Sequence, residues 1–261
     1  MKILLVIFTL QIFAFSRALA LDTCAAFEMV PHEGVWTLTN GARVPYPTQT
    51  RNLDSYILFG SLSASRAAEY LAPHGLKPAS VAGRALAALS VYDYKESDVG
   101  PFRESYLVFL TRHNGKLALF HELAWSSEET TALMSDEIWG IPSRRARISV
   151  DAGTSFAVAT PQGPVFEMSW AKKPVLHNPF AHNLSVYAVG PKDKDGRLKW
   201  SPIKSCGGAS SGSFDEARGD RLVVHDKALA ALLTRLGFKP LFKELARGQK
   251  AIQYLPEPAR R

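Results

Sequence analysis

Residues 105–125 read SYLVFLTRHNGKLALFHELAW, and this stretch decides the fold class. Two runs rich in leucine, aromatic and β-branched residues flank Asn114-Gly115, a pair that accepts the positive φ angles of a tight hairpin turn. Similar short runs occur at 55–60, 85–94, 147–150, 155–160, 165–170, 184–190 and 197–202. Many short strands favour a closed or cone-shaped sheet. We therefore predict one β-rich α+β domain.

Helical signals are fewer, and they predict helices at 63–71, 126–134 and 226–236. The last of these places its leucines on one stripe and meets Gly237, a residue typical of helix ends. Neither a repeat nor a linker-like stretch divides the chain. We expect a few helices packed outside a single sheet.

The first twenty residues have the pattern of a secretory signal peptide. Lys2 is followed by an apolar run at 3–15 and by the small residues Ala18 and Ala20. The run is shorter than the ~18 residues that a membrane span needs. We predict cleavage after Ala20, one mature domain over 21–261, and no membrane insertion after cleavage. The mature protein would be secreted or otherwise exported, to a periplasm or a secretory-pathway lumen.

Composition narrows the class of partner. The 261 residues are 46% hydrophobic and 21% charged, which is usual for a globular protein and excludes a disordered or collagen-like chain. The formal charge of +7 is spread over short clusters along the sequence. A nucleic-acid-binding protein usually concentrates its positive charge on one face. We predict a small-molecule partner and no nucleic acid.

Export also affects how the cysteines are interpreted. Cys24 and Cys206 would meet an oxidising compartment, where paired thiols are common, so we predict a disulfide between them; two unpaired thiols are the alternative. Asn183 begins an N-glycosylation sequon, which matters only in a eukaryote. His177 and His182 form the closest histidine pair and are interpreted as loop surface. We predict no metal site.

Two segments carry more specific information. Residues 100–105 read GPFRES and residues 136–144 read DEIWGIPSR. Together they resemble the acetoacetate decarboxylase-like superfamily, whose members show Gly-x-Tyr-x-Glu-Ser and then Arg-Glu-x-x-x-x-Pro-Lys-Lys. The 39 residues from Glu104 to Ser143 match the spacing between the glutamate and the first lysine of that pattern. The resemblance extends over about residues 50–256, with specific motifs only between Gly100 and Arg144.

The resemblance implies a cone of antiparallel sheet with outer helices around a largely apolar pocket. In the decarboxylases the first lysine forms a Schiff base with a β-keto acid, and the second keeps it nucleophilic. This chain has Ser143 and Arg144 at those positions. A serine hydroxyl forms no imine, and an arginine guanidinium stays protonated. Decarboxylation through an imine is therefore not expected at this site.

The family's pocket glutamate corresponds to Glu104. We expect Glu104 and Arg144 to form a catalytic acid/cation pair that holds a carboxylate or enolate and moves a proton. Ser143 and Arg51 are the expected substrate-binding residues, and Glu137 is expected to support the turn before them. The alternative is an inert buried salt bridge between Glu104 and Arg144, with Ser143 filling the lysine's space.

Three functions remain open. The first is a cofactor-independent lyase or isomerase without a Schiff base, acting on a β-dicarbonyl or a small carboxylic acid by isomerisation, dehydration or cyclisation, in specialised metabolism. The second is a catalytically silent protein that binds a small hydrophobic acid. The third is a decarboxylase that uses another amine, with the pair Lys172 and Lys173 as the candidates. A homo-oligomer is compatible with each of them.

Overall fold

The fold is described from a computed structural model that covers residues 27–113, 116–151, 153–174, 176–178, 184–190 and 198–256. The predicted signal peptide, Cys24 and Asn183 lie outside the described residues. None of the described helices is long and apolar enough to cross a membrane.

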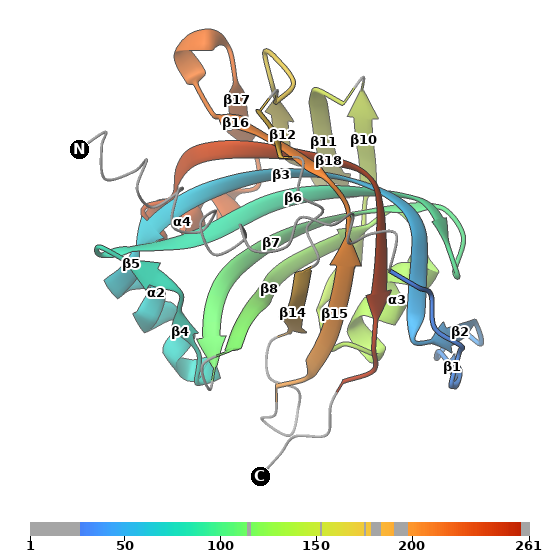
Figure 1. Ribbon diagram of the computed structural model, residues 1–261. Helices are drawn as coiled ribbons and strands as arrows, with labels where there is room; N and C mark the ends of the chain where they lie inside the picture. Colours follow the sequence, from blue (N-terminus) through green and yellow to red (C-terminus); the bar gives the residue numbers. More distant parts are fainter. Residues whose placement is uncertain are drawn as a thin grey trace.

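Seven strands close into a barrel (Figure 1). Their order is β18-β15-β14-β8-β7-β6-β3, and β3 pairs with β18 to close the ring. All neighbours in the ring are antiparallel except β14 and β8. The strands are β3 (Thr48–Ser63), β6 (Arg84–Ser97), β7 (Phe102–His113), β8 (Lys116–Ser126), β14 (Leu184–Val189), β15 (Trp200–Cys206) and β18 (Lys239–Gln253). The predicted closed, β-rich sheet is confirmed.

Local sequence accounts for the central strands of the barrel. β7 and β8 pair from Glu104 opposite Ser126 to His113 opposite Lys116, the register that a hairpin turn at 114–115 requires. The connection from β6 to β7 passes through Gly100, whose φ of 87° is readily adopted only by glycine. Because both connections are short, the two hairpins hold β6, β7 and β8 side by side.

A second, four-stranded antiparallel sheet covers part of the outer face of the barrel (Figure 1). It comprises β10 (Arg147–Asp151), β11 (Ser155–Thr160), β12 (Gly163–Ser169) and β17 (Arg221–Val224), in the order β10-β11-β12-β17. Phe156 and Phe166 from this sheet belong to the same buried cluster as Tyr56 and Leu107 of the barrel. Burial of these large apolar side chains stabilises the contact between the two sheets.

Helices α2 (Ala64–Leu71) and α4 (Lys227–Leu236) pack against the same outer cluster. The structure confirms both predicted helices to within one residue. Asp226 caps α4 by accepting a hydrogen bond from the backbone N–H of Leu229 at 2.8 Å, and Gly237 ends it in the left-handed region.

Helix α3 (Glu129–Glu137) begins three residues later than predicted. The reason is that β8 continues to Ser126, whose side chain hydrogen-bonds that of Thr131 instead of capping a helix. The strand predicted at 197–202 also lies later in the sequence than expected: β15 runs from Trp200 to Cys206.

The remaining elements are short. They are β1 (Gly34–Thr37), β2 (Arg43–Tyr46), β4 (Lys77–Pro78), β5 (Ser80–Val81), β9 (Ser143–Arg145), β13 (Leu176–Asn178), β16 (Ala209–Ser213) and the 3-10 turns η1 (Ala72–His74) and η2 (Glu216–Arg218). Of these, β9 matters most for the site, because it pairs in parallel with the end of β8.

The barrel has a distinct inner face. Alternate residues of its strands form a second buried cluster that includes Tyr106, Val108, Ala124 and Ala188, with Ile57, Phe59, Tyr92 and Ile203 packed against it. Met134, Ile138 and Trp139 of the α3 region belong to the same cluster. Because successive side chains of a strand point to opposite faces, this cluster identifies which residues face inward.

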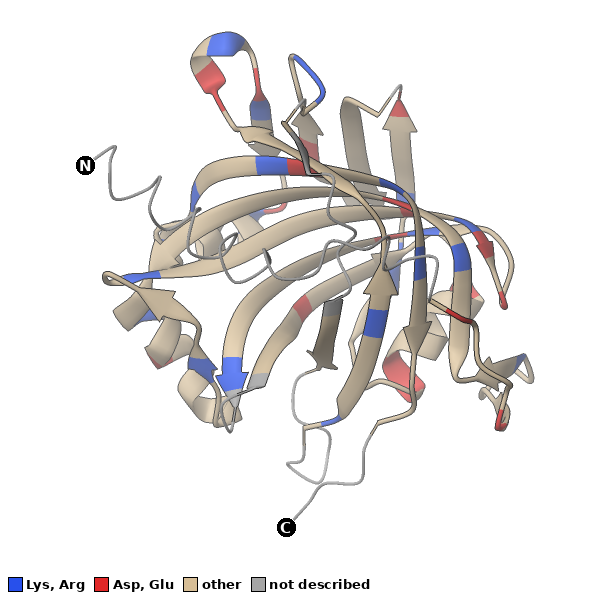
Figure 2. Ribbon diagram, in the orientation of Figure 1, with Lys and Arg blue, Asp and Glu red and all other residues tan. Residues whose placement is uncertain are grey.

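Charged residues of both signs are distributed over the described strands and loops (Figure 2). Both colours occur on β6, whereas β18 is mainly blue with one red segment. This distribution agrees with the dispersed positive charge of the sequence.

Candidate functional site

Glu104 is a buried carboxylate on the inner face of the barrel. It lies near the start of β7, and its side chain is only 3% exposed. The hydroxyl of Tyr106 donates a hydrogen bond to Oε2, and Oγ of Ser135 donates to Oε1 at 3.2 Å. The hydroxyl of Tyr94 is a further donor. The donors come from β7, α3 and β6, so three elements fix the position of the carboxyl group.

Burial dominates the acidity of this group. Removal from water raises the pKa of Glu104 from 4.5 to about 7, and the hydrogen bonds from Tyr106, Ser135 and Tyr94 oppose the rise. At neutral pH both the carboxylate and the carboxylic acid are therefore present. A carboxyl group with this property acts as either a general base or a general acid.

The groups around Glu104 remain neutral at this pH. Burial, and then the charge of Glu104, raises the pKa values of Tyr94 and Tyr106 well above that of an ordinary phenol. Burial lowers the pKa of His121 to about 4, and its ring packs edge-on to Tyr106 at 5.0 Å between centroids. The phenols are therefore neutral hydrogen-bond donors beside a carboxyl group that changes charge near neutrality.

Ser143, which the motif resemblance aligns with the family's first lysine, faces inward. Strand β9 places it opposite Ala124, which belongs to the inner cluster. Its Oγ is buried and has no hydrogen-bond partner among the described residues. A side-chain hydroxyl thus lies on the same face of the barrel as Glu104.

The expected pair of Glu104 and Arg144 is not formed. Arg144 is exposed and lies opposite Trp125, which belongs to the outer cluster, so it points away from the inner face. Within the described part of the chain Arg144 makes no ion pair with Glu104. The physical reason is the alternation of side chains along β9, which puts 143 and 144 on opposite faces. The inert salt bridge proposed as the alternative is also not formed.

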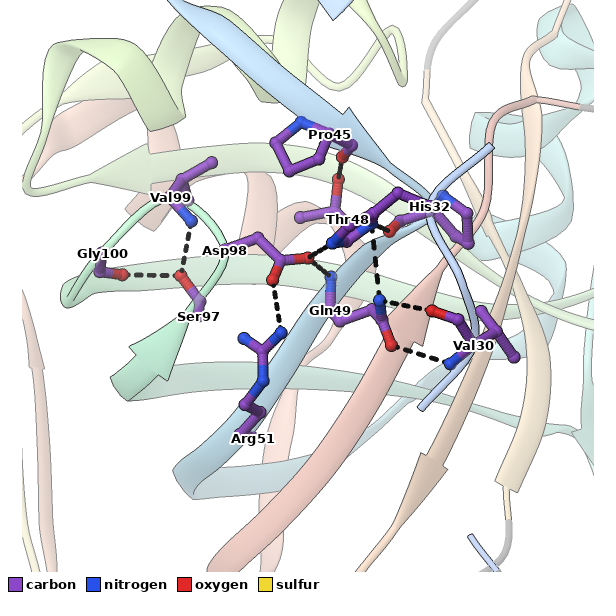
Figure 3. Close-up of polar contacts among 11 residues, drawn as sticks. Val30, His32, Pro45, Thr48, Gln49, Arg51, Ser97, Asp98, Val99 and Gly100 are labelled. Atoms are coloured by element: carbon purple, nitrogen blue, oxygen red, sulfur yellow. Dashed lines mark hydrogen bonds and ion pairs between the residues drawn. The ribbon is translucent and has the colours of Figure 1, made fainter. Parts of the chain in front are cut away.

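Arg51 belongs to a different cluster, shown in Figure 3. Its Nη2 lies 2.8 Å from Oδ1 of Asp98, whose other oxygen accepts the backbone N–H of Gln49 at 2.7 Å. The side chain of Gln49 in turn holds the backbone of Val30, with bonds of 3.0 and 2.8 Å. The predicted substrate-binding role of Arg51 is therefore not supported, because its guanidinium helps to anchor the N-terminal segment to the barrel.

Lysines do not replace the missing amine near Glu104. Lys172 and Lys173 are exposed after β12, as a solvated turn would be. Lys243 is buried, but its Nζ pairs with Asp220 at 2.7 and 2.8 Å. Lys199 donates to the backbone oxygen of Glu137 at 2.8 Å. None of the amino groups in the described ranges contacts Glu104.

Other site predictions have mixed outcomes. The side chain of Glu137 accepts hydrogen bonds from the backbone and hydroxyl of Thr39, which fits the supporting role expected of it. Among the described residues no group of three or more His, Cys, Asp or Glu is placed to hold a metal ion. Cys206 is buried, and its pairing with Cys24 stays a prediction. Two open hollows of about 580 and 510 Å³ lie elsewhere, and neither is lined by Glu104.

Sequence reasoning missed Tyr94, Ser135 and Glu244. Tyr94 and Ser135 hydrogen-bond Glu104, and both are too far from it in sequence for a local pattern to predict the contact. Glu244 lies on β18, a strand that the sequence analysis did not predict. Residues 242–245 read Phe-Lys-Glu-Leu, which has no apolar/polar alternation, so the sequence offered no strand signal at Glu244.

Comparison with known proteins agrees with this fold. The family model described as acetoacetate decarboxylase matches residues 39–182, which is more than half of the chain. The chain belongs to the acetoacetate decarboxylase family.

Two solved structures share the architecture. Acetoacetate decarboxylase from Legionella pneumophila subsp. pneumophila str. Philadelphia 1 is 16% identical, with a TM-score of 0.59 over 92% of this chain and 96% of that one. The enduracididine biosynthesis enzyme MppR with HEPES buffer bound is 14% identical, with a TM-score of 0.52 over 81% of this chain and 86% of that one. At these identities the likeness establishes the fold alone. No curated sequence matches the chain significantly.

Proposed function

We propose that this protein is an exported enzyme of the acetoacetate decarboxylase family that performs acid/base chemistry on a small carbonyl compound without forming an imine. The observation that carries the proposal is Glu104. It is a buried carboxyl group with hydroxyl donors and a pKa of about 7, on the face where Ser143 stands in place of the family's lysine. Isomerisation, dehydration and cyclisation of a β-dicarbonyl or related substrate all need such a group.

The proposed step is a proton transfer at carbon. The carboxylate of Glu104 removes a proton from the carbon next to the substrate carbonyl, and the carbonyl becomes an enolate. Once Glu104 has taken up the proton, the Tyr94 hydroxyl no longer faces a carboxylate charge, and its single O–H turns to donate a hydrogen bond to the enolate oxygen. The protonated Glu104 then returns the proton to another atom of the enolate, or to a leaving group. The hydroxyl of Ser143 supplies a further hydrogen bond to a substrate oxygen.

A catalytically silent binding protein is the second candidate. It is favoured by the loss of both lysines of the family pattern, since Ser143 and Arg144 replace them. A decarboxylase with a displaced amine has less support, because the described lysines closest to the barrel wall are either exposed or already paired.

Deuterium exchange tests the proposal. Pyruvate and hydroxyacetone are incubated in deuterated water, and loss of the proton signal next to the carbonyl is followed by NMR. We expect the wild type to accelerate exchange of at least one of the two, and Glu104→Gln to lose the acceleration.

Glu167→Gln is the matched control, because Glu167 is exposed on β12 and pairs with His225 at 3.2 Å. This variant should keep the wild-type rate. Acceleration that survives Glu104→Gln would contradict the assigned role of Glu104. Binding without any acceleration would favour the silent protein.

A further inference from the structure

Glu244 is a second carboxylate on the inner face of the barrel. Its neighbours in β18 point outward, because Lys243 pairs with Asp220 and Leu245 belongs to the outer cluster. The register places Glu244 opposite Ile57, which packs against the inner cluster. Alternation along the strand therefore turns the Glu244 side chain inward.

The side chain of Glu244 has no polar partner in the described structure. Two shielded aspartates each hold a cation: Asp54 pairs with Lys95 at 2.6 Å and Asp98 with Arg51 at 2.8 Å. By contrast, neither a hydrogen bond nor an ion pair is formed by Glu244 among the described residues, although its side chain is half-buried. Burial alone raises the pKa of this carboxyl group to about 7.

Tyr92 connects Glu244 to Glu104. It lies opposite Glu104 in the pairing of β6 with β7, and its ring packs against Tyr106 at 5.7 Å. Beyond the larger effect of burial, both carboxylates act on this phenol to raise its pKa. Strand β6, which carries Tyr92, lies between β7 and the pair β3 and β18 in the order of the sheet, so both glutamates face the same barrel interior. Neither has a lysine or arginine among the charged groups that act on it.

Two hydroxyl groups on the same face also have no partner in the described structure. One is Ser143 Oγ, and the other is Ser201 Oγ, whose residue is 0% exposed. Ser201 lies opposite Ala188, which belongs to the inner cluster. Buried polar groups are normally hydrogen-bonded. A ligand bound inside the barrel would supply the missing partners of these two hydroxyl groups.

We propose that Glu244 binds a cationic nitrogen, an ammonium or amidinium group, of a small substrate whose carbonyl is presented to Glu104. The carbonyl part of this inference rests on the proposed function, whereas the cation part rests on Glu244. A carboxylate held away from water without a counter-ion is costly, and a bound cation removes that cost. Negatively charged ligands would meet two carboxylates and no cation.

Aromatic groups beside Glu244 suit the same ligand. Phe242 precedes Glu244 by two residues on the inner face and stacks on Phe59 with 4.6 Å between ring centroids. Aromatic faces attract ammonium and amidinium groups. The positions opposite Glu244 on β3 and β16 are Ile57 and Ser211, which do not titrate, so Tyr92 is the titratable neighbour that senses its charge.

Three probes that differ in charge test the inference. Aminoacetone carries an ammonium group, hydroxyacetone is its neutral analogue, and pyruvate is an anion. Their Kd values are measured by calorimetry with the wild type, with Glu244→Gln and with the control Glu167→Gln. We expect the wild type and the control to bind aminoacetone at least about tenfold more tightly than hydroxyacetone or pyruvate, and Glu244→Gln to lose that preference.

Equal affinity of the wild type for aminoacetone and hydroxyacetone would overturn the inference, as would an unchanged preference in Glu244→Gln. If Glu244→Gln does not fold, the pH dependence of ligand affinity in the wild type tests the inference instead. Its affinity for aminoacetone should rise severalfold from about pH 5.5 to about pH 7, where the ammonium stays protonated, while that for hydroxyacetone stays constant. A constant affinity for both would contradict the inference.

The result is separable from the proposed function. Deuterium exchange of hydroxyacetone that depends on Glu104 would support the proposed function even if the cation preference were missing. A cation preference that depends on Glu244 would support this inference even if neither exchange probe reacted.

Discussion

Replacement of Glu104 by glutamine should remove a pH dependence from the stability of the protein. In the folded protein the pKa of Glu104 is about 7, compared with 4.5 for an exposed glutamate. The folded state therefore holds a proton that the unfolded state has already released. The contribution of Glu104 to the free energy of unfolding is complete below about pH 4.5, falls as the pH rises, and is lost above about pH 7.

The size of the effect follows from the same two pKa values. One pKa unit corresponds to about 1.36 kcal/mol, so the rise from 4.5 to about 7 represents about 3 kcal/mol. Glutamine keeps the shape of a protonated glutamate: its carbonyl oxygen accepts the hydrogen bond from Tyr106, and its NH2 group donates to Oγ of Ser135. At about pH 5 we expect wild type and Glu104→Gln to differ by less than about 1 kcal/mol. At about pH 8 the variant should be the more stable by up to about 3 kcal/mol.

Urea denaturation at the two pH values measures this difference directly. Glu244 contributes equally to both proteins, so its titration cancels. The control Glu167→Gln should differ from wild type by the same small amount at both pH values, because Glu167 is exposed. If Glu104→Gln were less stable than wild type by about 3 kcal/mol or more at about pH 8, Glu104 would be paired with a cation and the assignment would be wrong.

Three further outcomes are expected. Arg144→Lys should change the free energy of unfolding by less than about 0.5 kcal/mol and leave the affinity for aminoacetone unaltered, because Arg144 is exposed on the outer side of β9. Weaker binding of aminoacetone in calorimetry would show that Arg144 belongs to the site. Borohydride reduction with acetoacetate should add no mass to the protein, and an adduct mapped to Lys172 or Lys173 would revive the displaced-amine decarboxylase. Intact-mass analysis of secreted material should find a chain that begins near Leu21 with Cys24 and Cys206 joined, whereas an uncleaved start or two alkylatable thiols would exclude this.

The sequence predicted those features that depend on neighbouring residues. The hairpin around residues 114–115 and the end of α4 at Gly237 need only local backbone preferences, and both agree with the structure. Glu104 was identified because a spaced motif contains it. Its place on the inner face, and the inward position of Ser143, follow from strand alternation once β7 and β9 are known.

The sequence did not predict features that depend on distant pairing. β18 is recognisable as a strand mainly through its pairing with β3 and β15, both far away in sequence. The pairing of Arg144 with Glu104 was inferred from neighbouring positions in a motif, but one residue along a strand reverses the face. Arg51 was assigned to the site because some members of the family have a pocket arginine near this position, and nothing in the sequence indicated its bond to Asp98.

The central claim is that this protein moves protons at carbon without forming an imine. One measurement tests it directly: hydroxyacetone and pyruvate are incubated with the enzyme in deuterated water enriched in oxygen-18, and the recovered ketone is analysed by mass spectrometry. Formation and hydrolysis of an imine would introduce oxygen-18 at the carbonyl, whereas direct proton transfer by Glu104 introduces deuterium alone. We expect enzyme-dependent deuterium incorporation with oxygen-18 at the level of the enzyme-free control. Enzyme-dependent oxygen-18 incorporation at the rate of deuterium incorporation would contradict the account.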